Sequence, residues 1–325
     1  MAHTITQGLN GQFGAMIAGV SLADLKSPEF QDQSLSLWHA HGLFAVRGDE
    51  LADIAPTELV DWSGVFGVVE EIAQSGRDKM MVSGYPILRI GNVRDDAGEL
   101  VSSLARVPQL TSDNDIRYNP ETRRPVWHTD SLFRENPPIG SVFHCKQAPS
   151  SGAETLFADM RAAYADLDDQ TKSDLRGLEA VCSLAHHDKK INSYSPDYPI
   201  LSPEQRALNP ARRVPVVLPH PDTGVPALYG LNSSTCAVVP IGADVSDEDM
   251  DRYDLEGVED ESVQILRGLL PTVTGPEYTV KWSWQPGDIV VWDNRCTMHS
   301  GTGFDFTQYT REMWRLTLLS AAAGA

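Results

Sequence analysis

The fold of this chain is decided by the stretch Gly287-Asp288-Ile289-Val290-Val291-Trp292 and by the run Asp293-Asn294-Arg295-Cys296-Thr297-Met298-His299 that follows it. A turn followed by a short apolar run is typical of a buried strand. A second apolar run, Pro125-Val126-Trp127, leads into His128-Thr129-Asp130. Because side chains alternate between the two faces of a strand, His128 and Asp130 are expected to point to the same side.

These residues have the pattern of a redox-active iron site. A distant third ligand, His299, would complete a set of two histidines and one carboxylate, which leaves three positions open on a ferrous ion for a chelating cosubstrate and dioxygen. Arg311 follows His299 by twelve residues and offers a fixed cation suited to a carboxylate. A His-x-Asp motif by itself is more often a surface turn or a capping aspartate. The order of the four residues and their apolar surroundings favour the metal site.

The chain resembles the taurine dioxygenase and 2,4-dichlorophenoxyacetate dioxygenase family of iron(II)- and 2-oxoglutarate-dependent oxygenases, and the likeness runs over most of its length. The most specific segment carries Trp292-Asp293-Asn294-Arg295, His299, Arg311 and Arg315 at the spacing characteristic of the family. Three earlier segments are also similar to the family. Residues 13–22 resemble its opening strand and turn, and residues 42–48 resemble its next core strand. Residues 152–160 with 162–164 resemble its Gly-rich turn and the strand and helix start that follow.

The resemblance implies a fold, a metal site and two cosubstrates. The expected fold is mainly β with flanking helices, around a double-stranded β-helix core of the jelly-roll, cupin-like type. His128, Asp130 and His299 would be the catalytic residues and would bind iron(II). Thr155 and Arg311 would grip the far carboxylate of 2-oxoglutarate, whose keto acid end chelates the metal, and dioxygen is the other cosubstrate.

Arg315 is a candidate for binding the primary substrate. If residues 311–319 form a strand, Arg311, Met313, Arg315 and Thr317 share one face. Four strand residues span roughly 13 Å, which is too far for both guanidinium groups to serve one small carboxylate in the same way. Arg315 is therefore available for an acidic group on the substrate. A structural ion pair and a second hold on 2-oxoglutarate are the alternatives.

The predicted reaction is an oxidation of a C–H bond. Related halide-transferring enzymes have a small residue in place of the carboxylate, so Asp130 disfavours halogenation. Hydroxylation of a small, acidic metabolite, coupled to conversion of 2-oxoglutarate to succinate, is the expected outcome, whereas desaturation and cyclisation remain open. A metal-binding barrel acting as sensor or scaffold is the other alternative, although it would not need the carboxylate clamp of Thr155 and Arg311. Asn232 is a further candidate for the substrate pocket, with a turn as its alternative role.

Composition limits the class of protein. With 325 residues, 41% of them hydrophobic, we expect a single domain over residues 1–325. The formal net charge of -19 opposes nucleic acid as a partner. No signal peptide or membrane-spanning run is visible, so we expect a cytoplasmic protein without a membrane partner, and a homo-oligomer is left open. The cysteines lack CxxC spacing and are expected to be reduced core thiols: Cys145, Cys182, Cys236 and Cys296.

The remaining pattern predicts helices outside the barrel and two lid-like inserts. Helices are expected at residues 28–39, 57–65, 160–178 and 261–270, and strands at 86–90 and 278–284. The first insert, near 95–124, offers polar residues for substrate contacts: Asn114, Arg117, Tyr118 and Asn119. The second insert, near 186–217, begins with His186-His187-Asp188, for which a solvated turn is expected rather than a metal site.

Overall fold

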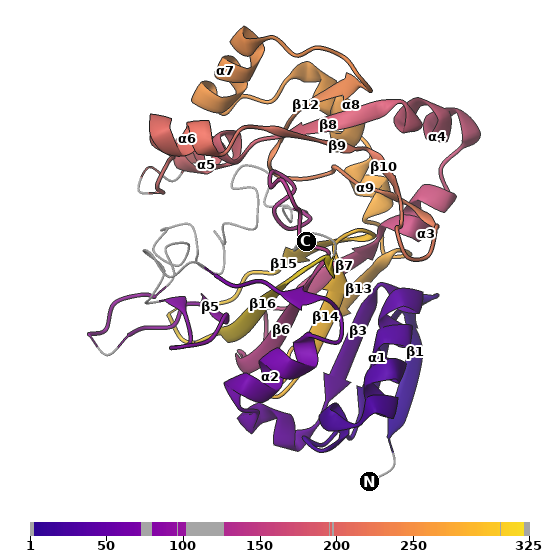
Figure 1. The fold of residues 1–325 in the computed structure, drawn as a ribbon, viewed down its shortest axis with the longest axis vertical. Coiled ribbons are helices and arrows are strands. Elements are labelled where there is room, and N and C mark those ends of the chain that lie inside the picture. The colour runs from indigo at the N-terminus through magenta and orange to yellow at the C-terminus, as the bar shows by residue number, and fades with distance from the viewer. Residues whose placement is uncertain are drawn as a thin grey trace.

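A sheet of mostly antiparallel strands forms the larger wall of the fold (Figure 1). The computed structural model describes residues 3–72, 80–95, 97–101, 127–194, 196, 198–305 and 307–321. In spatial order the strands of this sheet are β1 (Thr4–Asn10), β2 (Phe13–Ala18), β3 (Leu43–Arg47), β14 (Ile289–Asp293), β6 (Gly140–Gln147), β16 (Glu312–Leu319) and β4 (Val68–Val69), with β5 (Leu88–Gly91) also paired to β16. β2 and β3 run parallel to each other.

A smaller sheet faces the inner side of the larger one. It consists of β13 (Thr279–Trp282), β7 (Thr155–Asp159) and β15 (Thr297–Gly301). Buried side chains of both sheets form one hydrophobic cluster, in which Phe157 and Trp282 of the smaller sheet meet Val290, Trp292 and Met313 of the larger. The two facing sheets form the predicted jelly-roll core.

The strand predicted at residues 287–292 is β14, and it is buried on both faces. Ile289 and Val291 pack outward against the helices, whereas Val290 and Trp292 point into the space between the sheets. Their exposed fractions are 0 to 1%. A strand covered on both faces has no polar side, which explains why this stretch of the sequence is continuously apolar instead of alternating.

Two helices cover the outer face of the larger sheet (Figure 1): α1 (Pro28–His41) and α2 (Pro56–Ser63). α1 begins after Ser27, whose hydroxyl accepts the Phe30 N–H, with Pro28 at the first helical position. It ends at Gly42, which has a φ of 68°. Glycine suits this left-handed position because it has no Cβ to clash. Trp38 of α1 and Trp62 of α2 fill the layer between the helices and the sheet.

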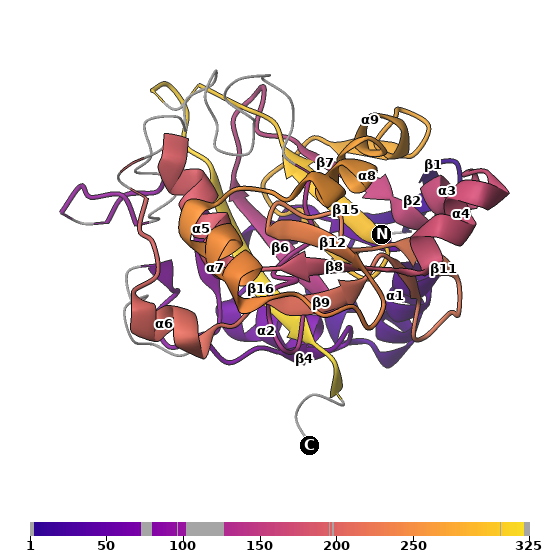
Figure 2. The same ribbon diagram turned by 90° about the horizontal axis from the view of Figure 1, so that it is seen from above.

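An outer lobe packs beside the smaller sheet (Figure 2). Its strands are β8 (Leu178–Cys182), β9 (Arg212–Pro215) and β12 (Thr235–Pro240) in the order β12-β8-β9, and the hairpin β10 (Val217–Pro219) and β11 (Pro226–Leu228). Its helices are α3 (Met160–Ala165), α4 (Asp169–Arg176), α5 (Leu184–Tyr194), α6 (Pro203–Leu208), α7 (Asp247–Glu256), α8 (Gln264–Arg267) and α9 (Leu270–Val273). Short 3-10 helices lie at η1 (Asp24–Lys26), η2 (Asp49–Asp53) and η5 (Glu261–Val263).

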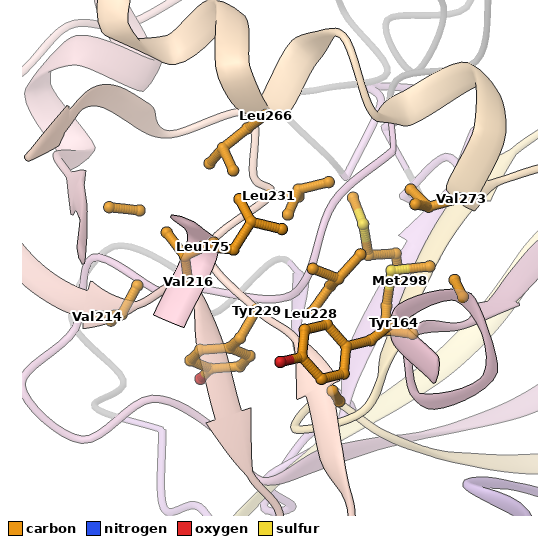
Figure 3. Packing of buried hydrophobic residues seen from close by; sticks show 14 of the residues in the cluster. Tyr164, Leu175, Val214, Val216, Leu228, Tyr229, Leu231, Leu266, Val273 and Met298 are labelled. Carbon is orange, nitrogen blue, oxygen red and sulfur yellow. The ribbon is translucent and has the colours of Figure 1, made fainter. Parts of the chain in front are cut away.

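One hydrophobic cluster joins the lobe to the smaller sheet (Figure 3). Leu231 and Leu266 of the lobe belong to the same cluster as Met298 of β15. Trp127 and Leu132, which flank the predicted ligands His128 and Asp130, belong to it as well. The lobe and the ligand segment are therefore parts of one packed unit.

Several sequence predictions are confirmed and three are wrong. The strand predicted over residues 311–319 is β16. The helix predicted from residue 160 begins there as α3, after Asp159, which accepts from the Arg161 N–H at 2.9 Å. The helix expected at 261–270 is divided among η5, α8 and α9. The helix predicted at 160–178 is instead two helices, because Asp168 starts a new one by accepting the Thr171 N–H at 2.9 Å. His186 lies in helix α5 and is fully buried, so the expected solvated turn is wrong.

Part of the first predicted insert lies outside the described residues. Asn114, Arg117, Tyr118 and Asn119 fall there, as do Pro125 and Val126. Among the described residues, no helix is both long enough and apolar enough to cross a membrane. All four cysteines are free and buried, as predicted.

Candidate active site

The structure brings His128, Asp130 and His299 together. One ligand atom of each lies within 4.8 Å of the others. His128 forms an isolated bridge with His299 of β15, in which each backbone N–H donates to the other's carbonyl, at 3.0 and 2.8 Å. Residues that exchange both bonds lie directly opposite each other, so their side chains share one face. Their ring centroids are 4.1 Å apart.

Asp130 uses its two oxygens differently. Oδ2 accepts from Ser141 Oγ at 2.8 Å and pairs with Arg315 Nη2 at 3.1 Å. Oδ1 lies 3.8 Å from His299 Nε2. The carboxylate is therefore held through one oxygen while the other is directed at the histidines. This arrangement suits binding of a metal ion through Oδ1 alone.

Asp130 carries its charge in spite of burial. Asp130 is only 6% exposed. Burial would raise the pKa of this carboxyl, but the Arg315 guanidinium and the imidazoles of His299 and His128 outweigh it, so the pKa lies well below the usual range. Asp130 is thus an anion at neutral pH, the state that a carboxylate needs in order to bind a metal ion.

Ser141 is a site residue that sequence reasoning missed. Ser141 of β6 pairs in register with Thr317 of β16, and Phe143 pairs with Arg315. Opposed residues share a face, so Ser141 and Arg315 both point into the barrel and reach Asp130. The signal in the sequence was weak, because one serine in an apolar strand gains meaning only from this register.

Aromatic rings fix the orientation of His299. Phe157 lies opposite His299 on β7, and the two rings stack with centroids 6.2 Å apart. Trp292 approaches the same imidazole at 4.9 Å. An imidazole enclosed on several sides has few rotamers available, so His299 is held in position before any ligand binds.

Thr155 and Arg311 are both buried inside the barrel region. Thr155 is 4% exposed and pairs with Gly301, two residues along the strand from the pair of Phe157 with His299, so it faces the same side as His299. The Thr155 hydroxyl accepts from Trp284 Nε1 at 2.9 Å. A hydroxyl that accepts in this way retains its own proton for a further acceptor.

Arg311 places a buried positive charge at the start of β16. The residue is 3% exposed, and its backbone N–H donates to Asn92 Oδ1 at 2.8 Å. Burial raises the pKa of the nearby Cys145 thiol to about 12, with the charge of Arg311 acting in the opposite direction. Cys145 is therefore a neutral packing residue beside this cation.

Asn232 lies beside the ligand segment, in the turn between β11 and β12. Its Nδ2 donates to the Thr129 carbonyl, and its Oδ1 accepts from the Ser234 N–H at 2.8 Å and from Ser234 Oγ at 3.0 Å. The side-chain amide is thus engaged inside the protein at both ends. This geometry favours the turn role over the predicted place in the substrate pocket.

A second cluster, His220, Asp293 and Cys296, has no comparable opening for a metal ion. Asp293 Oδ2 accepts from His220 Nε2 at 2.9 Å and from Arg295 Nη2 at 2.7 Å, and its Oδ1 accepts from Arg295 Nε at 2.9 Å. Both carboxylate oxygens are therefore already bonded. Burial raises the pKa of Cys296 well above its ordinary value, as expected for a packed thiol. The Asp-Asn-Arg run serves as a structural network behind β15.

A jelly roll that presents two histidines and one carboxylate has the arrangement of a non-haem iron oxygenase. The profile of the family described as "Taurine catabolism dioxygenase TauD, TfdA family" matches residues 5–317. The chain therefore belongs to this family. It is a dioxygenase that uses iron(II), 2-oxoglutarate and dioxygen.

Individual relatives agree with this membership. The chain is 30% identical to an (S)-phenoxypropionate/alpha-ketoglutarate-dioxygenase of Delftia acidovorans, over 94% of this chain and 91% of that protein. It is 34% identical to an alpha-ketoglutarate-dependent 2,4-dichlorophenoxyacetate dioxygenase of Burkholderia sp. (strain RASC), over 60% and 58% of the two chains. The crystal structure of AAD-2 in complex with Mn(II) and N-oxalylglycine has the same fold, with a TM-score of 0.72, 24% identity and coverage of 99% and 98%.

Proposed function

We propose that this protein hydroxylates a small substrate that carries an acidic group, and that His128, Asp130 and His299 hold the iron for this reaction. The observation that supports the metal assignment is the placement of three ligand atoms within 4.8 Å of one another. In the overall reaction, 2-oxoglutarate, dioxygen and a C–H bond give succinate, carbon dioxide and a C–OH group. One oxygen atom enters succinate and the other enters the product.

The donor set fits iron(II). Two imidazole nitrogens and one carboxylate oxygen suit a ferrous ion and leave positions open on its other side. Asp130 supplies the negative charge, and its Oδ1 is free of the hydrogen bonds that hold Oδ2. Bound iron supplies the activation of dioxygen. The protein residues hold the ligands in place through the backbone bridge and the aromatic contacts of His299.

Thr155 and Arg311 are suited to hold the far carboxylate of 2-oxoglutarate. Arg311 offers several N–H donors in a fixed plane. The Thr155 hydroxyl accepts from Trp284 Nε1, so its own proton can be donated to a carboxylate. The net charge of the chain is -19, so a dianionic cosubstrate needs such local cations. Burial of Arg311 strengthens its attraction for a carboxylate.

Two observations support the proposal that the substrate carries an acidic group: the names of the relatives and the exposure of Arg315. The two relatives described above are named for aryloxy acids, and others are named for a sulfonate and a sulfate ester. The Arg315 side chain is 22% exposed and uses one terminal nitrogen on Asp130. A guanidinium has five N–H donors, so Arg315 can hold Asp130 and an acidic substrate at the same time.

A substrate panel tests this proposal. Purified protein with ferrous ion and 2-oxoglutarate is incubated with aryloxy acids, small sulfonates, sulfate esters and N-substituted acids, and succinate is measured above the background without substrate. Each acid is matched with its neutral amide or alcohol. We expect stimulation by at least one acid and not by its neutral partner, with a hydroxylated product by mass spectrometry. Equal stimulation by a neutral partner would contradict the acidic-substrate proposal.

A cytoplasmic location remains part of this proposal. The four cysteines are free and buried, which suits a compartment that keeps thiols reduced. Fractionation of cells expressing the tagged chain tests it. Recovery of the chain outside the cytoplasmic fraction would contradict the proposed location.

A further inference from the structure

The segment that carries His128 and Asp130 turns sharply between two anchored ends. Trp127 and Leu132 are buried in the hydrophobic cluster that joins the lobe to the smaller sheet. Between them, Ser131 has a φ of 52°, a left-handed conformation that residues other than glycine rarely adopt. Such a conformation persists only where the surroundings hold it. The contacts of the central residue, Thr129, therefore matter for the two ligands that flank it.

Thr129 is held on both sides. Its hydroxyl donates to the Thr297 carbonyl at 3.1 Å, and its own carbonyl accepts from Asn232 Nδ2. The carbonyl belongs to the peptide that joins Thr129 to Asp130. Rotation of this peptide would swing the Asp130 side chain away from His299. Asn232 is thus placed to fix the direction of one ligand through the backbone.

Asn232 can face Thr129 only with its amide nitrogen. Its Oδ1 accepts the Ser234 backbone N–H at 2.8 Å, and a backbone N–H always needs an acceptor. The other end of the amide must therefore be NH2, which is the donor that the Thr129 carbonyl requires. The residue is 3% exposed, so water cannot easily replace this bond.

A partly buried ion cluster holds the turn that carries Asn232. Lys190 of α5 donates to the Ser233 carbonyl and pairs with Glu259 at 3.0 Å. Arg267 of α8 donates to the Asn232 carbonyl at 3.1 Å and pairs with Glu259 at 2.6 Å. Leu231, just before this turn, packs in the same hydrophobic cluster as Met298, just before His299 (Figure 3). The lobe and β15 are therefore packed against each other beside the candidate iron site.

We propose that Asn232 is a positioning residue of the iron site, which holds the Thr129 carbonyl so that His128 and Asp130 meet the metal together with His299. The inference rests on the proposed metal ligands and adds a role for the lobe, which contributes this contact from outside the jelly roll. Both ends of the Asn232 amide are bonded inside the protein. Its effect passes through the backbone between the two ligands.

The test compares Asn232→Asp with wild type and with Asn10→Asp. Aspartate keeps the shape of the side chain but turns an oxygen toward the Thr129 carbonyl. Asn10 is a matched control because its Nδ2 also donates to backbone carbonyls, of Pro276 at 2.7 Å and Glu277 at 3.0 Å, on the outer strand β1. Affinity for ferrous ion alone is measured anaerobically by competition with a chelator. Thermal unfolding is measured on the same samples.

We expect Asn232→Asp to weaken iron binding by about 10- to 100-fold, the usual effect of losing a contact that orients a ligand. Asn10→Asp should bind iron like wild type. If Asn232→Asp does not fold, Asn232→Ala, which buries no charge, should show the same direction of change. A folded Asn232 variant that binds iron with wild-type affinity would overturn the positioning role. Wild-type protein that binds no iron would instead overturn the proposed function, and this inference with it.

Discussion

Arg311→Ala should raise the apparent KM for 2-oxoglutarate by a large factor. Arg311 is 3% exposed, so a carboxylate bound to it is largely removed from water. Truncating one partner of a desolvated charge pair costs about 2 to 5 kcal/mol. At about 1.4 kcal/mol per tenfold, this corresponds to a factor of roughly thirty to several thousand. The maximal rate at saturating cosubstrate should fall much less, because the metal ligands are unchanged.

Two readouts separate this effect from general damage. Succinate formation over a range of 2-oxoglutarate concentrations gives the apparent constant, and an anaerobic titration of the iron-loaded protein with 2-oxoglutarate gives binding alone. Arg89→Ala is the matched control. Arg89 of β5 pairs in register with Trp314 of β16, and its Nε donates to Glu312 Oε1 at 2.9 Å. It therefore lies near the residue that follows Arg311. Because Trp314 and Arg315 are adjacent on β16, Arg89 faces away from the side that carries Arg315.

Arg89→Ala should leave the 2-oxoglutarate constant within about threefold of wild type, since Arg89 faces away from the proposed cosubstrate site and its ion pair with Glu312 is partly exposed. An unchanged constant in Arg311→Ala would refute the proposed carboxylate contact. Equal weakening in Arg311→Ala and Arg315→Ala would show that both arginines act on 2-oxoglutarate. Arg315 would then be a second contact for 2-oxoglutarate and not the contact for an acidic substrate.

Three further outcomes are expected. Arg315→Ala removes a partner of Asp130 Oδ2 and should weaken iron binding, but at saturating iron it should keep 2-oxoglutarate binding and lose the stimulation of succinate formation by substrate; retained stimulation by an acidic substrate would contradict its role. Ser141→Ala should weaken iron binding by about tenfold because Asp130 Oδ2 loses a donor, whereas Ser300→Ala should not, since the Ser300 hydroxyl has no hydrogen-bond partner among the described residues; equal effects would refute the Ser141 contact. Burial would raise the pKa of Glu259, but Lys190 and Arg267 lower it from 4.5 to about 2, so its stabilisation is present above pH 4.5 and is lost as pH falls toward 2. The free energy of unfolding, measured against pH, should therefore fall less in acid for Glu259→Gln than for wild type. An identical fall in both proteins would contradict the role of this ion cluster.

The core of the fold and the individual residues of the candidate triad were predictable because their sequence signals are local. β14 is a continuous apolar run, and a histidine and an aspartate one residue apart point the same way on any extended segment. His299 and Arg311 follow β14 at short spacing, so one segment of the chain carried most of the pattern. The meeting of His128 and Asp130 with His299 depends on the long-range bridge between residues 128 and 299, and the family resemblance predicted it.

The supporting residues were not predictable because their roles depend on long-range pairing. Ser141 and Arg315 share a face beside Asp130 only through the register of β6 with β16, and Asn232 meets Thr129 across 103 residues of sequence. His186 was misassigned because adjacent histidines were judged on strand geometry, whereas the segment is helix α5, which buries His186 and leaves His187 partly exposed. Periodicity over so few residues does not separate a turn from a helix.

An anaerobic visible spectrum of the protein with ferrous ion and 2-oxoglutarate tests the proposed iron site most directly. If His128, Asp130 and His299 hold an iron that the keto acid chelates, wild-type protein should show a weak charge-transfer band that saturates at one equivalent of iron. His299→Ala should lose the band while remaining folded. Absence of the band in wild type, or its full retention in His299→Ala, would contradict the proposed iron site.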